Sequence, residues 1–304
     1  MNIAVTINDK YFYPLYIMLN TLFAQHRGVA VQVFLIHSRV SKRNRKILAG
    51  LCKKNGGKLI EVFVSEDEFS DAPTFSYFSK EMYYRILAAK LLPEDVDRVL
   101  YLDPDLIVTD SLLEFYNMPL DNCFFAGARD RLQDVVTNPY WKVLGFTGKN
   151  NYINSGVLLC NLALLRKEQN IQDIFDMLKE RGDSLKFPDQ DLINVLYEGK
   201  IAVVDDRYNL NPNILYIKEY FCYNFAPWLM KKPAILHYMG EGKPWRVSYK
   251  GGLYQYYWRE EKKYNPKKKW HMFFRSLKIP YLTIISGKQF VLHLKRRIKR
   301  LIKK

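Results

Sequence analysis

Short apolar runs alternate with amphipathic segments along most of the chain. The runs are rich in β-branched and aromatic residues and too short for most helices, so they predict buried strands. These runs are residues 3–7, 29–37, 59–64, 98–103, 123–128, 157–161, 203–206 and 233–237. Apolar residues at helical spacing predict helices over residues 12–23, 41–55, 79–92, 162–179 and from 187, with a short one after 111. Strands that alternate with helices in this way predict an α/β fold with parallel strand pairs.

The last part of the chain differs from the rest in its charge. The net charge is +16, yet residues 259–304 hold 16 Lys and Arg against 2 Glu, so the preceding residues are nearly neutral. Near the end, apolar residues recur at spacings of three, four and three, at Val291, Leu294, Ile298 and Leu301. A basic amphipathic helix of this kind suits an anionic membrane surface, and the apolar stripe makes nucleic acid the less favoured partner. We therefore expect a folded domain over residues 1–250 and a basic, aromatic, membrane-associating segment over 251–304.

The cysteines and the N-terminus bear on the compartment. The four cysteines are scattered without C-x-x-C spacing, which favours reduced thiols over a disulfide framework. The first residues read as a strand and lack the basic region of a signal peptide. We therefore expect a cytoplasmic protein that lies peripherally on the inner face of the cytoplasmic membrane.

The strongest chemical feature is Asp103-Pro104-Asp105, directly after a predicted strand. Two acids at i and i+2 of an extended chain point to the same side, and two carboxylates suit Mg²⁺ or Mn²⁺. The carboxyl ends of strands are also where open α/β sheets bind ligands. Taken alone, the pattern is more typical of an acidic surface loop than of a metal site.

Three further motifs follow Asp103-Pro104-Asp105 along the chain. They are Asn154-Ser155-Gly156, Pro188-Asp189-Gln190-Asp191, and His237-Tyr-x-Gly240-x-x-Lys243-Pro-Trp. Together the four motifs resemble those of glycosyltransferase family 8, the glycogenin-like and bacterial lipooligosaccharide galactosyltransferase-like enzymes. The resemblance runs from Ile3 to Trp245, roughly four-fifths of the chain.

This resemblance implies a GT-A fold, which is Rossmann-like with a mixed, mainly parallel central sheet. It also implies a retaining transfer of a hexose, galactose or glucose, from a UDP-sugar to a saccharide acceptor of a bacterial envelope glycolipid or polysaccharide. Asp103, Asp105 and His237 match the family's metal ligands, which hold Mn²⁺, with Mg²⁺ possible. Two carboxylates and an imidazole form a mixed N/O set that Mn²⁺ accepts.

The resemblance also assigns the binding residues. Those matching the nucleotide and diphosphate contacts are Thr6, Asn8, Tyr11, Gly240 and Lys243, and those matching the donor-sugar contacts are Arg85, Asn154, Asp189 and Gln190. Asn8 and Lys10 depart from the Asp and Asn that many relatives carry at these positions, which weakens the prediction of base preference. Asparagine can still donate and accept at a base edge.

Asp189 and Gln190 also match the family's catalytic positions. Because an amide oxygen is a poor nucleophile, we expect same-face attack through an ion-pair-like transition state rather than a covalent intermediate on Gln190. Two alternatives remain open at this point. One is a nucleotidyltransferase, and the other is a non-catalytic protein that binds sugar nucleotides or nucleic acid.

Overall fold

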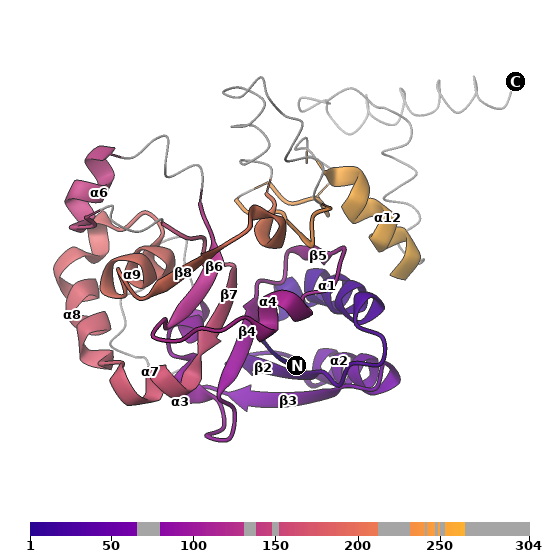
Figure 1. Cartoon of the computed structure of the whole chain (residues 1–304). Helices are drawn as coiled ribbons and strands as arrows, with labels where there is room; N and C mark the ends of the chain where they lie inside the picture. Colours follow the sequence, from indigo (N-terminus) through magenta and orange to yellow (C-terminus); the bar gives the residue numbers. More distant parts are fainter. Residues whose placement is uncertain are drawn as a thin grey trace, which may run out of the picture.

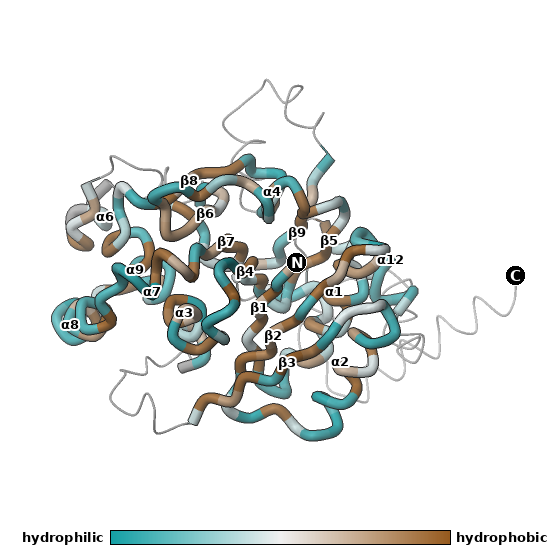
Figure 2. The backbone as a smooth tube through the Cα atoms, turned by 60° about the horizontal axis from the view of Figure 1, so that its bottom comes forward, coloured by the Kyte–Doolittle hydropathy of each residue, from teal (hydrophilic) through white to brown (hydrophobic). Residues whose placement is uncertain are grey.

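The computed structural model describes residues 1–65, 80–130, 138–147, 152–211, 232–240, 242–246, 249 and 253–264. Its centre is a seven-stranded sheet in the order β3-β2-β1-β4-β7-β6-β8, beside a two-stranded ribbon of β5 and β9 (Figure 1 and Figure 2). The strands are β1 Asn2–Thr6, β2 Gln32–His37, β3 Lys58–Phe63, β4 Arg98–Leu102, β5 Leu106–Val108, β6 Phe125–Ala128, β7 Val157–Asn161, β8 Ile201–Val204 and β9 Ile235–His237. Every strand except β5 was predicted, although β8 begins and ends two residues earlier than the predicted 203–206.

The helices connect these strands and flank the sheet. The α-helices are α1 Phe12–Gln25, α2 Lys42–Lys54, α3 Ala88–Leu91, α4 Leu113–Asn117, α6 Asn138–Leu144, α7 Leu162–Glu168, α8 Ile171–Arg181, α9 Pro188–Leu196 and α12 Tyr254–Tyr264. The 3₁₀ helices are η1 Asp9–Tyr11, η3 Lys80–Arg85, η4 Gly182–Ser184 and η5 Asp206–Asn209. Within the described residues, no helix is both long and apolar enough to cross a membrane.

The sheet is mixed and mainly parallel, as predicted. Strands β3, β2, β1 and β4 run parallel, whereas β7 is antiparallel to both of its neighbours, β4 and β6. The edge strand β8 is parallel to β6. Because six of the seven strands therefore end at the same edge, the loops after β1 and β4 come together there.

Apolar side chains cover both faces of the sheet. Along β1, Ile3 and Val5 pack with α1 and α2, whereas Ala4 packs with α3, α7 and α9 on the other face. The alternation is the two-residue period of a strand whose faces are both buried. The strands at the centre of the molecule are accordingly mostly brown in Figure 2.

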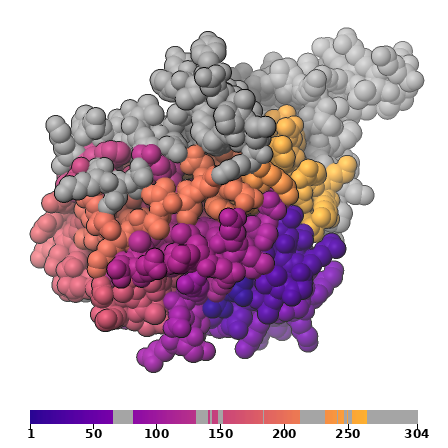
Figure 3. All heavy atoms as spheres, viewed as in Figure 1, coloured from indigo at the N-terminus to yellow at the C-terminus, as the bar shows by residue number. Residues whose placement is uncertain are grey.

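A third apolar cluster joins the β5–β9 ribbon to α1 and α12. Its buried members include Ile107, Leu236 and Tyr257. In Figure 3 the amber-yellow residues of α12 lie against the indigo N-terminal residues, consistent with the contact between α1 and α12. Residues 253–264 of the predicted membrane segment therefore belong to the folded body, and the predicted amphipathic helix near the C-terminus lies outside the described residues.

Two predicted helices are wrong in their extent. The segment 79–92 forms the 3₁₀ helix η3 and then the short α3; the Lys90 N–H donates to the Leu87 carbonyl, while the Ile86 carbonyl accepts from the Gln169 side chain. The segment 162–179 divides into α7 and α8, because the Asn170 side chain accepts from the backbone N–H of Gln172 and begins a new helix.

Candidate functional site

The pairing of two short strands brings the predicted metal ligands together. Strand β4 ends at Leu102, and β5 begins at Leu106, directly opposite His237 at the end of β9. His237 Nε2 lies 3.4 Å from Asp105 Oδ1 and 3.9 Å from Asp103 Oδ2. One ligand atom from each of the three residues lies within 4.8 Å of the others. The three residues are therefore close enough to bind one cation, and the group of Asp103, Asp105 and His237 is called the metal cluster below.

Gly156 lets the imidazole and one carboxylate approach each other. A Cβ at this position would lie 2.4 Å from His237 Cε1 and 2.6 Å from Asp103 Oδ2. The Asp103 N–H donates to the Gly156 carbonyl at 2.8 Å, which holds the two backbones together. The glycine of the Asn154-Ser155-Gly156 motif thus serves the metal cluster through its lack of a side chain.

The two acids of the cluster have different electrostatic surroundings. Burial raises the pKa of Asp103, although the Arg85 guanidinium acts in the opposite direction. Burial also acts to raise the pKa of Asp105, but the Lys243 ammonium and His237 outweigh it and lower that pKa below its ordinary value. Asp105 is therefore ionised at neutral pH and provides a hard anionic ligand. The donor set of two carboxylates and an imidazole fits Mn²⁺ or Mg²⁺.

Arg85 links the metal cluster to the predicted sugar-binding residues. Its guanidinium lies 3.0 Å from Asp103 Oδ1 and 3.1 Å from Asp189 Oδ2. It also donates to the backbone carbonyl and the hydroxyl of Ser155, at 3.1 and 3.2 Å. Tyr101 supports the same carboxylate, because its hydroxyl donates to Asp103 Oδ1 at 3.0 Å. The buried Arg85 guanidinium therefore orients both Asp103, a predicted metal ligand, and Asp189, a predicted donor-sugar residue.

The predicted donor-sugar residues form a buried amide network. Asn154 Nδ2 donates to Gln190 Oε1 at 2.8 Å, and the Ser155 N–H donates to the same oxygen at 3.1 Å. Gln190 Nε2 in turn donates to Asp130 Oδ2 at 3.0 Å. Asp189 accepts from the Ser155 hydroxyl at 2.9 Å, at the N-terminal end of α9. The four side chains of Asn154, Ser155, Asp189 and Gln190 are all buried.

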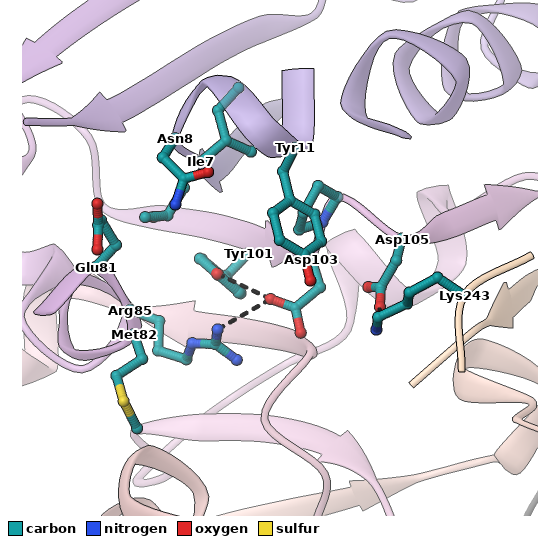
Figure 4. A pocket seen from close by; sticks show the side chains of 12 residues that line it. Ile7, Asn8, Tyr11, Glu81, Met82, Arg85, Tyr101, Asp103, Asp105 and Lys243 are labelled. Carbon is teal, nitrogen blue, oxygen red and sulfur yellow. Dashed lines mark hydrogen bonds and ion pairs between the residues drawn. The ribbon is translucent and has the colours of Figure 1, made fainter. Parts of the chain in front are cut away.

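A cavity of about 220 Å³ opens beside the metal cluster. Figure 4 shows Asn8 and Tyr11 on one side of it, with Arg85, Asp103 and Lys243 on the others. The predicted nucleotide residue Thr6 also lines it, whereas Gly240 lies in the adjoining loop with φ of +86°.

The predicted nucleotide residues are positioned by neighbouring contacts. The Trp245 ring meets the Tyr11 ring edge-on, with centroids 5.9 Å apart. Asn8 Oδ1 accepts from the Lys10 N–H and begins η1, so its amide group is held within its own turn. Lys243 Nζ donates to Asp105 Oδ2 and to the Tyr238 carbonyl. These contacts place one cation and one aromatic ring at the cavity, next to the metal cluster.

Three residues at the site were not predicted. Tyr101 looked like an ordinary core residue of β4, and Asn209 lies in a polar stretch without periodicity. Asp130 had a usable signal, since it follows the carboxyl end of β6, where ligand-binding residues gather. Both Asp130 and Asn209 are almost completely buried, as expected for groups that hold other polar side chains in place.

Comparison with known proteins decides the family. The family model described as "Glycosyl transferase family 8" matches residues 2–248, most of the chain. The chain belongs to glycosyltransferase family 8. The resemblance inferred from the four motifs is thereby confirmed.

Individual relatives agree with this assignment. The chain is 23% identical over 252 residues to a lipopolysaccharide 1,2-glucosyltransferase of Escherichia coli K12, which covers 81% of this chain and 72% of the relative. It is 25% identical over 256 residues to the lipopolysaccharide glucosyltransferase WaaO of the same strain, with coverage of 81% and 72%. The crystal structure of the galactosyltransferase LgtC with donor and acceptor sugar analogs superposes with a TM-score of 0.77 at 23% identity, covering 86% of this chain and 96% of that one. The fold is therefore the predicted GT-A fold.

Proposed function

We propose that this glycosyltransferase transfers a hexose, galactose or glucose, from a UDP-sugar to a saccharide of a bacterial envelope glycolipid or polysaccharide, with retention of configuration and with a divalent cation. The observation that carries the proposal is the convergence of Asp103, Asp105 and His237 beside a cavity that Lys243 also lines. The lipopolysaccharide glucosyltransferases among the relatives support an envelope saccharide as acceptor.

The leaving diphosphate sets the first requirement of this reaction. A bound Mn²⁺ or Mg²⁺ held by Asp103, Asp105 and His237 would offset the negative charge that develops as the glycosidic bond breaks. Lys243 supplies a second positive charge at the cavity, and its contact with Asp105 keeps the ammonium next to the metal cluster. In this proposal Lys243 holds the diphosphate and Tyr11 contributes to binding the uridine.

The donor sugar would lie on the other side of Arg85, near Asn154, Asp189 and Gln190. Carboxylate and amide groups suit sugar hydroxyls, and the Arg85 guanidinium, 3.1 Å from Asp189 Oδ2, holds that side chain in place. Gln190 Oε1 already accepts from Asn154 and from the Ser155 N–H. Because both hydrogen bonds reduce the electron density available on this oxygen, its contacts favour same-face attack over a covalent intermediate. A diphosphate oxygen of the leaving UDP would then accept the proton of the acceptor hydroxyl.

The proposal is tested by incubating the full chain with a panel of UDP-sugars, with and without MnCl₂, and measuring the release of UDP. We expect release from UDP-galactose or UDP-glucose that depends on the metal and is lost in Asp103→Asn. Pyrophosphate release from a nucleoside triphosphate would instead show a nucleotidyltransferase. No turnover of any donor, with nucleotide binding retained, would show a non-catalytic binding protein.

We also propose that the basic C-terminal segment holds the enzyme on the inner face of the cytoplasmic membrane. Since α12 packs on the folded body through Tyr257, a truncation after Tyr264 removes basic residues without cutting that contact. The truncated chain should keep its release of UDP and lose sedimentation with anionic vesicles. Unchanged sedimentation would contradict this part of the proposal.

A further inference from the structure

The candidate metal ligand His237 has a second ring nitrogen, and a buried amide contacts it. His237 Nδ1 lies 2.8 Å from Asn209 Oδ1. Asn209, at the end of η5, is 1% exposed, and its Nδ2 donates to Asn154 Oδ1 at 2.8 Å. A line of hydrogen bonds therefore runs from the imidazole through Asn209 and Asn154 to Gln190.

The direction of every hydrogen bond in this line follows from a backbone donor. The Gly156 N–H donates to Asn154 Oδ1 at 3.0 Å, and an N–H group can only donate, so this atom of Asn154 is the oxygen. Asn209 must then present its NH₂ group to that oxygen, which turns its own oxygen toward His237. An oxygen can only accept there, so Nδ1 carries the proton of the imidazole.

The remaining ring nitrogen is thereby left free to bind a cation. In the neutral imidazole a proton on Nδ1 puts the lone pair on Nε2, the atom that faces Asp105 Oδ1 and Asp103 Oδ2. We propose that Asn209 is a positioning residue: it holds His237 in the tautomer and orientation that allow Nε2 to complete the metal site. This inference rests on the proposed metal dependence, because it concerns the same three ligands.

The same amide also connects the metal side to the sugar side. Asn209 donates to Asn154, and Asn154 donates to Gln190, so loss of the donor group of Asn209 disturbs these two predicted donor-sugar residues. Loss of the acceptor group of Asn209 disturbs His237, the candidate metal ligand that this oxygen contacts. A single residue thus has two separable functions, and two substitutions can divide them.

Asn209→Leu removes both groups, whereas Asn209→Asp keeps an acceptor for Nδ1–H and loses the donor to Asn154. Asn194→Leu is the matched control, because Asn194 is equally buried and bonds Ile153 and the Gln190 carbonyl without contacting His237. The affinity of each full-length variant for MnCl₂ alone is measured by the loss of the free Mn²⁺ electron paramagnetic resonance signal. Thermal unfolding records which variants are folded.

We expect Asn209→Leu to raise the Kd for Mn²⁺ about 10- to 100-fold, the usual effect of losing a partner of a metal-bound histidine. Asn209→Asp and Asn194→Leu should leave that Kd within about threefold, a change too small for the loss of such a partner. Asn209→Asp should still lower kcat for UDP release, because Asn154 then faces a carboxylate. An unchanged Kd in Asn209→Leu, or equal losses in Asn209→Leu and Asn194→Leu, overturns the proposal.

A second measurement does not depend on a bound metal. In ¹⁵N-histidine-labelled wild-type chain, at a pH where the imidazole is neutral, His237 should show a pyrrole-type Nδ1 and a pyridine-type Nε2. Asn209→Leu should show a mixture of tautomers. A wild-type His237 protonated on Nε2 overturns the inference, whereas failure of the wild-type chain to bind Mn²⁺ with the Nδ1–H tautomer present contradicts only the proposed metal dependence.

Discussion

Gly156→Ala tests the metal site by adding one methyl group to it. The new Cβ would lie 2.4 Å from His237 Cε1 and 2.6 Å from Asp103 Oδ2. Ordinary contacts begin at about 3.5 Å, so the imidazole, the carboxylate or both must move by roughly 1 Å. Gly156 is not among the described glycines with positive φ, so its backbone conformation is open to alanine.

A displacement of this size exceeds what a metal site tolerates. Ligand distances must stay within about 0.2 Å of their proper values, and a misplacement of about 1 Å can cost about 100-fold in rate. We therefore expect Gly156→Ala to lower kcat/KM for metal-dependent UDP release by about 100-fold and to weaken Mn²⁺ binding comparably. Overpacking should reduce the free energy of unfolding by about 1–3 kcal/mol, which leaves the protein folded.

The control is Gly127→Ala, in the neighbouring strand β6. Its Cβ would lie 2.9 Å from Ile153 Cδ1 and 3.3 Å from both Leu158 Cδ2 and the Val157 carbonyl oxygen, and none of these three residues is a candidate metal ligand. This variant should lose stability without losing metal affinity. If Gly156→Ala is folded and keeps both UDP release and Mn²⁺ affinity within about twofold of wild type, far from the factor of about 100 above, the convergence of these ligands on one cation is refuted.

Two further substitutions test the phosphate and sugar sides. Lys243→Met removes the ammonium group next to Asp105. We expect kcat/KM for UDP release to fall about 100- to 1000-fold, the range for losing one group that stabilises transition-state charge. Unchanged kinetics would contradict a role of Lys243 in binding the diphosphate. Because Lys243 lowers the pKa of Asp105, the contribution of this pair to stability is complete above the unfolded pKa of about 3.9 and is lost as the pH falls. The metal-free stability difference between wild type and Lys243→Met should therefore be largest near neutral pH and narrow in acid, as measured by denaturant unfolding. Gln190→Ala should retain about 10% or more of kcat if attack occurs on the same face, whereas a loss of about 10⁴-fold would indicate a nucleophile.

The sequence was most informative where chemistry depends on residues close together in the chain. The apolar run before Asp103 predicts a buried strand, which β4 confirms, and the two acids after it line the same cavity. The extended backbone expected across these acids is wrong, because Pro104 and Asp105 form a turn between β4 and β5. His237 could be added because the motif around it resembles that of a family. Composition alone would have left it as a core histidine, which its 3% exposure also fits.

The sequence was least informative where contacts depend on the tertiary fold. Strand β5 has only three residues and pairs with β9 far along the chain, so no local periodicity predicts it. Asn209 contacts Asn154 and His237, 55 and 28 positions away, and nothing in its surroundings distinguishes it from a loop asparagine. The break before Asn170 was readable, because asparagine is a favoured N-cap, but the apolar spacing across it favoured one continuous helix.

The charges around the metal cluster predict that cation and nucleotide bind cooperatively. Three carboxylates, Asp103, Asp105 and Asp189, face two permanent cations, Arg85 and Lys243, so these five groups sum to one negative charge. This net negative charge would repel a diphosphate, whereas a bound divalent cation would make the net charge of the site positive. The affinity for UDP should therefore rise about 5- to 150-fold with saturating Mn²⁺, and by linkage UDP should raise the affinity for Mn²⁺ by the same factor. Calorimetric titrations of UDP with and without Mn²⁺, and of Mn²⁺ with and without UDP, measure the two changes in affinity. A UDP Kd that is equal with and without Mn²⁺ would mean that the cation does not hold the diphosphate.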